Sequence, residues 1–446
     1  MFRTLNAPHN GANTLTIYWR RPLYLSLLML IPWTSTQAEQ VEHKLTLSSA
    51  IKYSLEQNPS LKVFEFRKIA LRGQQETASL RPAYEVGFEA ENFSGTGNFS
   101  GSDNVELTVS LSSVIEMGDK RTARVNVVNS SRAQLDVQRQ VEALELFGEV
   151  TRRYIDVLAA QERVTLAEEG AQLAQNTLNE VTKRAKRGAT PEAEVKRAQA
   201  AAGQSQLTVS SEKQQLAYLK VALAALWGEK MPSFSKVEGN LFQFGEDVEF
   251  QRLYARTKQN PAITIFATEE RLKEAEIRLA KTQASTNIRW SIGLRQFQET
   301  DDTALTAGFN VPLFSSKRST GSIISAIAAR DEVLTRKEAA LLKLHTQLFR
   351  AYSSRQQAIF SFKKLQSNII PSLKQALKET RKAYQRGRYS YLDYLTARQE
   401  LITARRSLID AGSAALRYGA DIEQLTAEPL PASQYDSLKE YSGFLP

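Results

Sequence analysis

The chain of 446 residues carries the same ordered set of signals twice, and this duplication constrains the fold more than any other feature. Gln57-Asn58-Pro59 recurs as Gln259-Asn260-Pro261, and Arg187-Gly188 recurs as Arg386-Gly387. The two shifts, 202 and 199 residues, agree closely. Such a period is far too long for one unit of a solenoid, so it predicts a duplicated module of helices and strands.

The predicted repeats are residues 39–227 and 250–427, joined by residues 228–249. Before them, two arginines precede the short apolar run 23–31 and then small residues up to Ala38, a pattern typical of a secretory signal peptide at 1–38. The apolar run is about half of the roughly 20 residues that a membrane-spanning helix needs, so cleavage is favoured over anchoring. Residues 428–446 form a predicted C-terminal tail.

Composition excludes several classes of protein. The 58 basic and 48 acidic residues are interspersed, without a basic stripe, so no nucleic-acid partner is expected. The absence of cysteine excludes disulfides, thiolate metal sites and lipid attachment at a cysteine. A mean hydropathy of -0.36 excludes a protein of many membrane-spanning helices, but alternating barrel strands would give a similar average.

Very long helices are expected in both repeats. No proline occurs between Pro82 and Pro191, and residues 120–186 are rich in helix-forming residues, which predicts a helix about 100 Å long. Apolar residues at alternating spacings of three and four predict packing seams, typical also of a soluble coiled coil. The first seam is Val195, Ala198, Ala202, Ser205, Val209, Glu212, Leu216, Leu219, Leu223 and Leu226, and the second is Leu341, Leu344, Leu348, Ala351, Arg355, Ala358, Phe362, Leu365 and Ile369. Gly188 and Gly387 are expected to form the tips of two helical hairpins.

Each repeat also contains a predicted β-hairpin, at about 83–113 and about 287–313. The strands alternate apolar and polar residues over about the length of a tilted transmembrane strand. A half-buried soluble sheet would give the same alternation. If the strands are membranous, four cannot close a barrel within one chain, so the barrel must be shared between copies. The predicted lipid-facing residues are Val86, Phe88, Leu107, Val109, Trp290, Ile292 and Phe309.

These features together resemble the TolC-like outer-membrane efflux factor family over essentially the whole mature chain. The resemblance rests on the two Gln-Asn-Pro motifs, on Val311-Pro312-Leu313-Phe314, and on Ala383-Tyr384-Gln385-Arg386-Gly387 followed by Leu392-Asp393. It implies an α+β fold and a homotrimer. Each chain would give four strands to a transmembrane β-barrel, and the long antiparallel coiled-coil helices would form an α-barrel as a periplasmic tunnel.

One segment resembles the heavy-metal-efflux branch of that family. Residues 111–121 carry Glu116, Gly118, Lys120 and Arg121, which recur at the strand-to-helix junction of this branch. Asp119 stands where the branch usually has a second glycine.

The resemblance also implies a gate at the tunnel entrance, formed by Glu194, Tyr384 and Asp393. The alternative for the two acids is an ordinary helix start, where a carboxylate complements the helix dipole. The chain departs from the family at Tyr389, where an arginine is usual, and has Arg388 one position earlier. The tip residues expected to contact a periplasmic adaptor protein are Arg187, Gly188, Arg386, Gly387 and Arg388.

No catalytic constellation is apparent. His43 and His345 lie in no cluster of metal-ligating residues, and Glu116 with Asp119 fits a helix N-terminus better than a catalytic pair. We therefore expect neither enzymatic activity nor a cofactor, and an inner-membrane pump would supply the energy. The expected function is a passive outer-membrane exit channel for heavy-metal cations or small toxic molecules. The alternatives are a duct for type I protein secretion and a periplasmic coiled-coil adaptor or scaffold.

Overall fold

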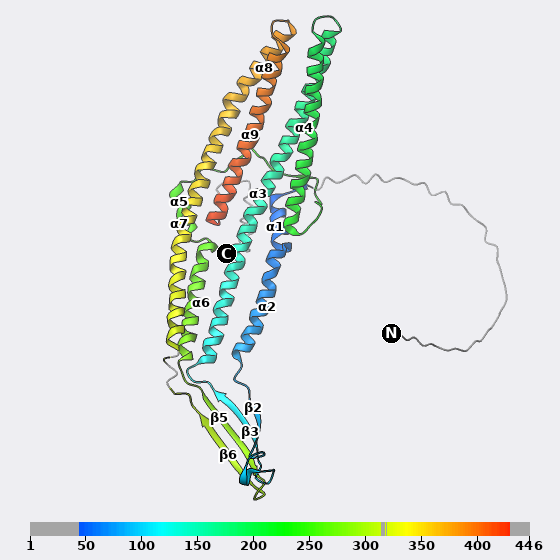
Figure 1. Ribbon diagram of the computed structural model, residues 1–446. Helices are drawn as coiled ribbons and strands as arrows, with labels where there is room; N and C mark the ends of the chain where they lie inside the picture. The colour runs from blue at the N-terminus through cyan, green and yellow to red at the C-terminus, as the bar shows by residue number, and fades with distance from the viewer. Residues whose placement is uncertain (1–43, 314–316, 318, 429–446) are drawn as a thin grey trace, which may run out of the picture. The chain divides into compact units, whose positions relative to one another are not determined.

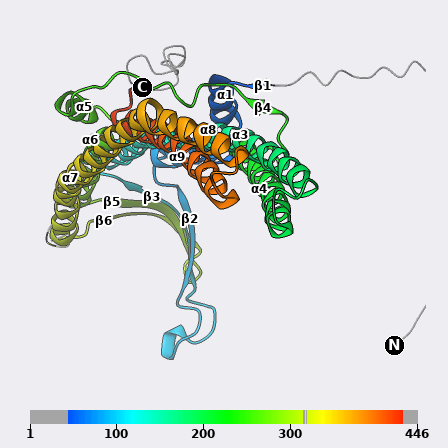
Figure 2. The same ribbon diagram turned by 90° about the horizontal axis from the view of Figure 1, so that it is seen from above.

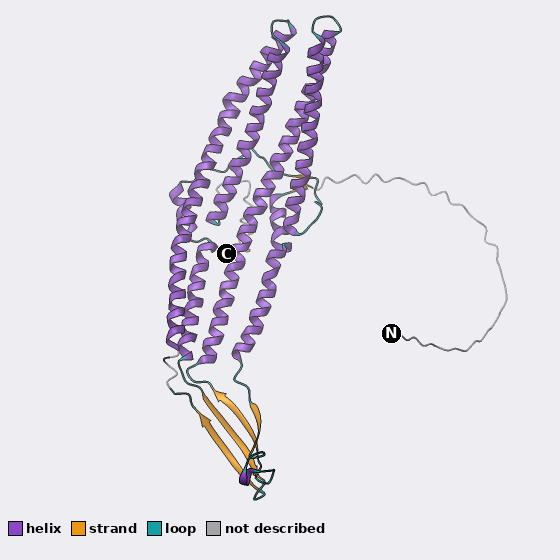
Figure 3. Ribbon diagram, in the orientation of Figure 1, coloured by secondary structure: helices purple, strands orange, loops and turns teal. Residues whose placement is uncertain are grey.

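The computed structural model describes residues 44–428 except 314–316 and 318. The predicted signal peptide and all but the first residue of the predicted tail lie outside this range. The described residues belong to one compact unit, which is mostly helical (Figures 1 and 3). Its helices are α1 (Leu47–Gln57), α2 (Pro59–Ser79), α3 (Lys120–Ala185), α4 (Glu192–Ala224), α5 (Phe250–Thr257), α6 (Pro261–Gln283), α7 (Thr320–Lys364), α8 (Ile370–Gln385) and α9 (Tyr391–Thr426).

The sheet has four antiparallel strands in the order β2-β3-β5-β6. Their bounds are β2 (Glu85–Glu91), β3 (Glu106–Ile115), β5 (Ile288–Phe297) and β6 (Asp302–Asn310), which fall within or next to the two predicted hairpins. The register aligns Phe88, Val109, Leu294 and Leu305 in one row across all four strands. The sheet curves, and Figure 2 shows this curvature from the end of the helices.

The long helix α3 separates the sheet from the hairpin tips. Its 66 residues correspond to about 100 Å. At its first residue, the buried Lys120 Nζ donates hydrogen bonds to the carbonyl of Ser285 (2.6 Å) and to Asn287 Oδ1 (2.6 Å), just before β5. Its other end lies beside the end of α8 at the tips (Figure 1).

The asparagines of the two Gln-Asn-Pro motifs join helices end to end. Asn58 Oδ1 accepts the N–H of Ser60 at the start of α2, while Asn58 Nδ2 donates to the carbonyl of Leu226, just after α4. Asn260 likewise accepts the N–H of Ala262 at the start of α6, and donates to two carbonyls at the end of α9. One side chain thus satisfies orphan backbone groups of two helices, which become nearly continuous.

The predicted joint at 228–249 packs against the middle of the helices. Its strand β4 (Lys236–Val237) pairs in parallel with β1 (Lys44–Leu45), and sequence patterning missed this pair because it is only two residues long. Arg355, the polar residue in the second predicted seam, is 5% exposed and donates to Asp247 Oδ1 (2.6 Å) and to the carbonyl of Gly245 (2.7 Å). The interruption of the seam therefore anchors the joint.

The second predicted seam is shifted at its end by a π-helical turn. Residues Leu365–Ile369 form this turn between α7 and α8, and Pro371 follows it. Proline has no N–H for the preceding turn, so the ladder of hydrogen bonds is interrupted there. Ile369, predicted in the seam, is 39% exposed, and Ile370 is buried instead. The prediction for Ile369 was wrong because a wide turn adds one residue to the helical period.

The strand-to-helix junction after β3 has a left-handed backbone. Gly118 and Asp119 have φ values of 76° and 57°. A Cβ on Gly118 would lie 2.3 Å from Ser285 Oγ. Aspartate tolerates the left-handed region better than most residues, which explains why it can stand where the resemblance leads us to expect a second glycine.

We predict that Asn260→Ala destabilises the protein by about 1–3 kcal/mol, since it removes a helix cap and leaves two carbonyls without a donor. Asn260→Asp should also destabilise, because it keeps the cap acceptor but loses both donated bonds. Thermal unfolding of the purified protein measures both effects. Asn179→Ala, at an exposed position of α3, is the control. Equal stability of Asn260→Ala and the control would contradict the end-to-end joint.

Candidate functional site

Both hairpin tips end in the same backbone motif. The N–H of Gly188 bonds to the carbonyl of Ala185, and the N–H of Ala189 bonds to that of Arg184. Gly387 and Arg388 repeat this pattern with the carbonyls of Tyr384 and Ala383. Both glycines have φ of 70°, as the Schellman motif requires. The predicted turns at 188 and 387 therefore have a defined geometry.

A cluster of three tyrosines lies just inside the tips, between the hairpin of α3 and α4 and the hairpin of α8 and α9. Tyr384, at the end of α8, stacks on Tyr394 with ring centroids 5.7 Å apart and lies 6.2 Å from Tyr391. All three rings are buried and pack against Val181 and Ala198 of the other hairpin. Aromatic burial therefore holds the two hairpins together.

Polar contacts reinforce this contact between hairpins. Arg184 of α3 donates to the carbonyls of Tyr384 (2.8 Å) and Gln385 (3.1 Å). Glu180, one turn earlier, accepts from Gln385 (2.7 Å) and pairs with Arg381 (3.4 Å). The contacts of Glu180 are exposed to solvent and are accordingly weaker.

Glu194 and Tyr384, two of the predicted gate residues, lie near each other. Glu194 is half-buried in the first turn of α4 and accepts a hydrogen bond from Thr190 Oγ1 (3.1 Å). Burial raises the pKa of the Tyr384 hydroxyl, and the negative charge of Glu194 adds to this rise. The two residues come from different hairpins, so they could respond to a movement between them.

Asp393, the third predicted gate residue, caps its own helix. Its Oδ2 accepts the N–H of Ser390 (3.0 Å), and its own N–H bonds to Ser390 Oγ (3.2 Å), which is a capping box. The Ser390 hydroxyl and N–H lower the pKa of the exposed Asp393 carboxyl. Within one chain, Asp393 thus takes the helix-start role that the sequence left open.

The predicted adaptor-contact residues are accessible. Arg187, Arg386 and Arg388 have exposed side chains at the tips, next to the exposed ring of Tyr389. Sequence reasoning did not choose a role for Arg184, because a basic residue near a helix end gives no sign of which partner it has. Only the tertiary contact distinguishes Arg184 from its basic neighbours.

The other candidate site is the sheet, whose two faces differ in chemistry. Phe88 is 81% and Phe309 is 78% exposed on the apolar face, and most of the other predicted lipid-facing side chains are exposed beside them. Trp290 is half-buried, with its ring edge against Tyr84. On the polar face, Arg295 donates to Thr108 and pairs with Glu91 (2.7 Å) and Glu106 (2.8 Å).

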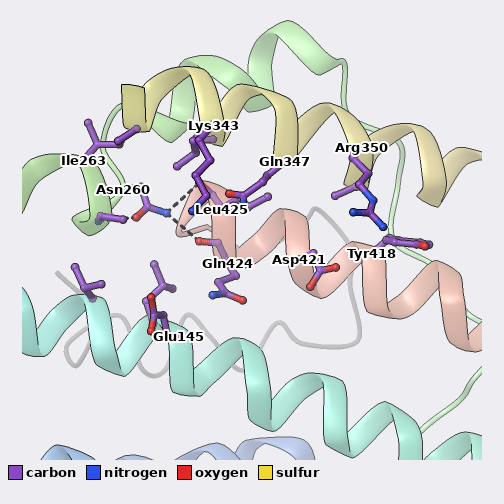
Figure 4. Close-up of a pocket in the computed structure, with 16 residues that line it drawn as sticks. Glu145, Asn260, Ile263, Lys343, Gln347, Arg350, Tyr418, Asp421, Gln424 and Leu425 are labelled. Carbon is purple, nitrogen blue, oxygen red and sulfur yellow. Dashed lines mark hydrogen bonds between the residues drawn. The ribbon is translucent and has the colours of Figure 1, made fainter. Parts of the chain in front are cut away.

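A groove of about 640 Å³ lies where α9 ends and α6 begins, between α3 and α7 (Figure 4). Asn260 and Gln424 belong to its wall, and Glu145 of α3 faces it. Burial, followed by the charge of Glu142, raises the pKa of Glu145. The groove is present because α9 ends and α6 begins there. Its polar rim indicates no particular chemistry.

Within residues 44–428, apart from the four undescribed positions, no group of histidines and acids could hold a metal ion. In the same part of the chain, no helix is both long and apolar enough to cross a membrane.

The fold is that of solved outer-membrane channel proteins. The structure of CusC matches with a TM-score of 0.71 at 17% identity, covering 91% of this chain and 98% of CusC. VceC of Vibrio cholerae matches with a TM-score of 0.68 at 20% identity, covering 86% of this chain and 96% of VceC. The CmeC outer membrane channel of Campylobacter jejuni matches with a TM-score of 0.70 at 17% identity, covering 89% and 88%.

Sequence comparison then gives the family. The family model described as "Outer membrane efflux protein" matches residues 50–229 and 255–428, one stretch within or next to each predicted repeat. The chain belongs to this family. The resemblance drawn from the sequence is thereby confirmed. A curated relative is the cobalt-zinc-cadmium resistance protein CzcC of Cupriavidus metallidurans, 24% identical over 297 residues, which are 67% of this chain and 71% of CzcC.

We predict that Gly387→Ala loosens the tip, since alanine in the left-handed region costs about 1 kcal/mol or more. The basic tip offers several sites for trypsin, so limited proteolysis should cut the variant faster near residue 386. Gly203→Ala is the matched control, because Gly203 lies in an open position within α4, where alanine is favoured. Equal cleavage rates in the two variants would argue against the Schellman geometry.

Proposed function

We propose that this protein is a passive exit channel in the outer membrane, formed by three copies of the chain. The observation that carries the proposal is a four-stranded sheet with an exposed apolar face, attached to long helices of which α3 is about 100 Å long. Membership of the outer membrane efflux protein family supports it. A periplasmic adaptor or scaffold would need the long helices but not a sheet of this kind.

The sheet supports a barrel shared between chains. Among the described residues, β2 and β6 each have a hydrogen-bonded neighbour on one side only. Open edges are not tolerated in a bilayer because each unpaired backbone group costs several kcal/mol. Pairing β6 of one chain with β2 of the next would close a 12-strand barrel in a trimer. The apolar face would then contact lipid and the polar face would line the lumen.

The helices leave two unpartnered edges that fit the same arrangement. Large apolar side chains are exposed along α2 and α4 on one side, and along α7 on the other. Such different edges would meet in a head-to-tail contact between chains, and this kind of contact forms a ring when the rotation closes. The residues are Val63, Phe66, Ile69, Leu207 and Tyr218 on the first edge, and Ile324, Leu342, Phe349 and Phe360 on the second.

The hairpin tips would form the periplasmic entrance and its gate. Glu194 and Tyr384 come from neighbouring hairpins, and Asp393 is exposed near the start of α9. Three copies would bring these groups around one axis, where acids favour cations. The exposed arginines at the tips would contact the adaptor, and a separate inner-membrane pump would supply the energy.

Heavy-metal cations are the cargo that the comparisons favour, since CzcC is a cobalt-zinc-cadmium resistance protein. Small toxic molecules remain in the proposal, and type I protein secretion is the alternative. Deleting the gene in its host and measuring tolerance to cobalt, zinc and cadmium separates these cargoes. Loss of metal tolerance without loss of protein export supports the first, and the reverse result supports the alternative.

We predict that Phe88→Arg prevents insertion, since an arginine at mid-bilayer on the lipid face costs about 2–4 kcal/mol. Glu89→Arg, one residue on and on the opposite face, is the matched control and should leave insertion intact while altering conductance. Recovery of each variant in the outer-membrane fraction is the measurement. Equal loss of both proteins would show that the assignment of faces is wrong.

We predict that the purified protein is a trimer in mild detergent and conducts ions in a planar bilayer. Mass measurement of the detergent complex gives the number of chains, and bilayer recording gives the conductance. A stable folded monomer would overturn the shared barrel. A trimer that binds no membrane would favour the scaffold instead.

A further inference from the structure

Arg184 connects the two hairpins through the carbonyl groups at the end of α8. Its Nη1 lies 2.8 Å from the carbonyl oxygen of Tyr384 and 3.1 Å from that of Gln385, both in the last turn of α8. The carbonyls of the last helical turn carry the negative end of the helix dipole, and that of Tyr384 also accepts the N–H of Gly387 (3.0 Å). Arg184 of α3 is therefore a C-terminal cap of α8 supplied by a different hairpin.

The same guanidinium also covers an aromatic ring. Arg184 Cζ lies 4.6 Å from the centroid of the Tyr384 ring, within the range of a cation–π contact. The same ring also stacks on Tyr394 of α9, with planes 9° apart. Arg184, Tyr384 and Tyr394 thus form one layered contact from α3 through α8 to α9.

We propose that Arg184 is the positioning residue that holds the tunnel entrance closed. This inference rests on the proposed gate at the hairpin tips, and it names the contact that must break when they separate. If α8 and α9 move away from α3, α8 loses its cap and Arg184 loses both carbonyls and the ring. Arg184 positions the gate and need not contact the cargo.

The role belongs to Arg184 and not to basic charge at the tips in general. Arg187 lies three residues further along, carries the same charge and is exposed, and the described residues contain no ion pair or hydrogen bond from its side chain. A planar guanidinium can bond to two carbonyls and lie on a ring together, whereas the compact ammonium of lysine fits such a site poorly. Arg184→Lys should therefore restore the contact only in part.

Single-channel recording of the full-length protein tests the proposal. Arg184→Gln should raise the open probability about tenfold or more, because hydrogen bonds to a charged group contribute about 1.5–3 kcal/mol and each 1.4 kcal/mol is a factor of ten. Arg184→Lys should lie between this variant and the wild type. Lys183→Gln, which removes an exposed positive charge one residue earlier in α3, is the control and should leave the open probability unchanged.

A second experiment tests the same contact by cross-linking the two hairpins. The chain has no cysteine, so Glu180→Cys and Gln385→Cys introduce a single pair at positions whose native side chains touch. In the Arg184→Gln protein, joining this pair with a short thiol-specific linker that a reductant can cleave should return the channel to its closed state, and cleavage should reopen it. The same pair in the wild-type background, joined and then cleaved, shows what the two cysteines do alone.

The outcomes separate this inference from the proposed function. A wild-type trimer that conducts, with Arg184→Gln and Lys183→Gln behaving alike, would overturn the role of Arg184 and leave the channel intact. A cross-link with no effect on an open Arg184→Gln channel would also overturn it. If the wild-type protein forms no channel at all, the proposed function fails first. Should Arg184→Gln not assemble, Arg184→Lys with the cross-link carries the same test.

Discussion

The ends of the long helices are the constraint on which this structure depends. Every helix leaves carbonyls and N–H groups without partners at its ends. In this structure several long helices end where the layer of helices continues. Asn58 and Asn260 satisfy two helices each at the middle of the unit. Gly188 and Gly387 satisfy the ends at the tips through backbone bonds. The layer of helices is continuous because the backbone groups at these helix ends are capped.

The capping groups differ in how readily the sequence reveals them. Asparagine before proline and glycine after a basic helix end are local signals, so the repeats and the tips could be placed from the sequence. Arg184 caps a helix 200 residues further along the chain, and no local pattern marks it. The sequence also could not decide between gate and helix start for Asp393. An acid three residues after Ser390 fits a capping box, and an acid at a pore entrance could have the same position.

The second packing seam was predictable over most of its length. The prediction was wrong where the π-helical turn changes the backbone. The second seam was correct through Phe362 in the sense that its residues are buried or half-buried, and even its arginine is buried against the joint. The joint was predicted as a simple connection, because two-residue strands and single anchoring contacts leave no periodic signal. Its buried side chains, Phe234, Val237, Leu241 and Val248, tie it to the helices.

The π-helical turn before α8 sets the orientation of everything beyond it. One residue advances a helix by about 100°, so the extra residue at 365–369 rotates the whole outer segment by that angle relative to α7. Tyr384 faces the neighbouring hairpin only because this rotation occurred about four turns earlier. A deletion of one residue in the wide turn would remove this rotation and point a different side of α8 toward α3. The hairpin tips would then lose their aromatic contact without any change to the residues that form it.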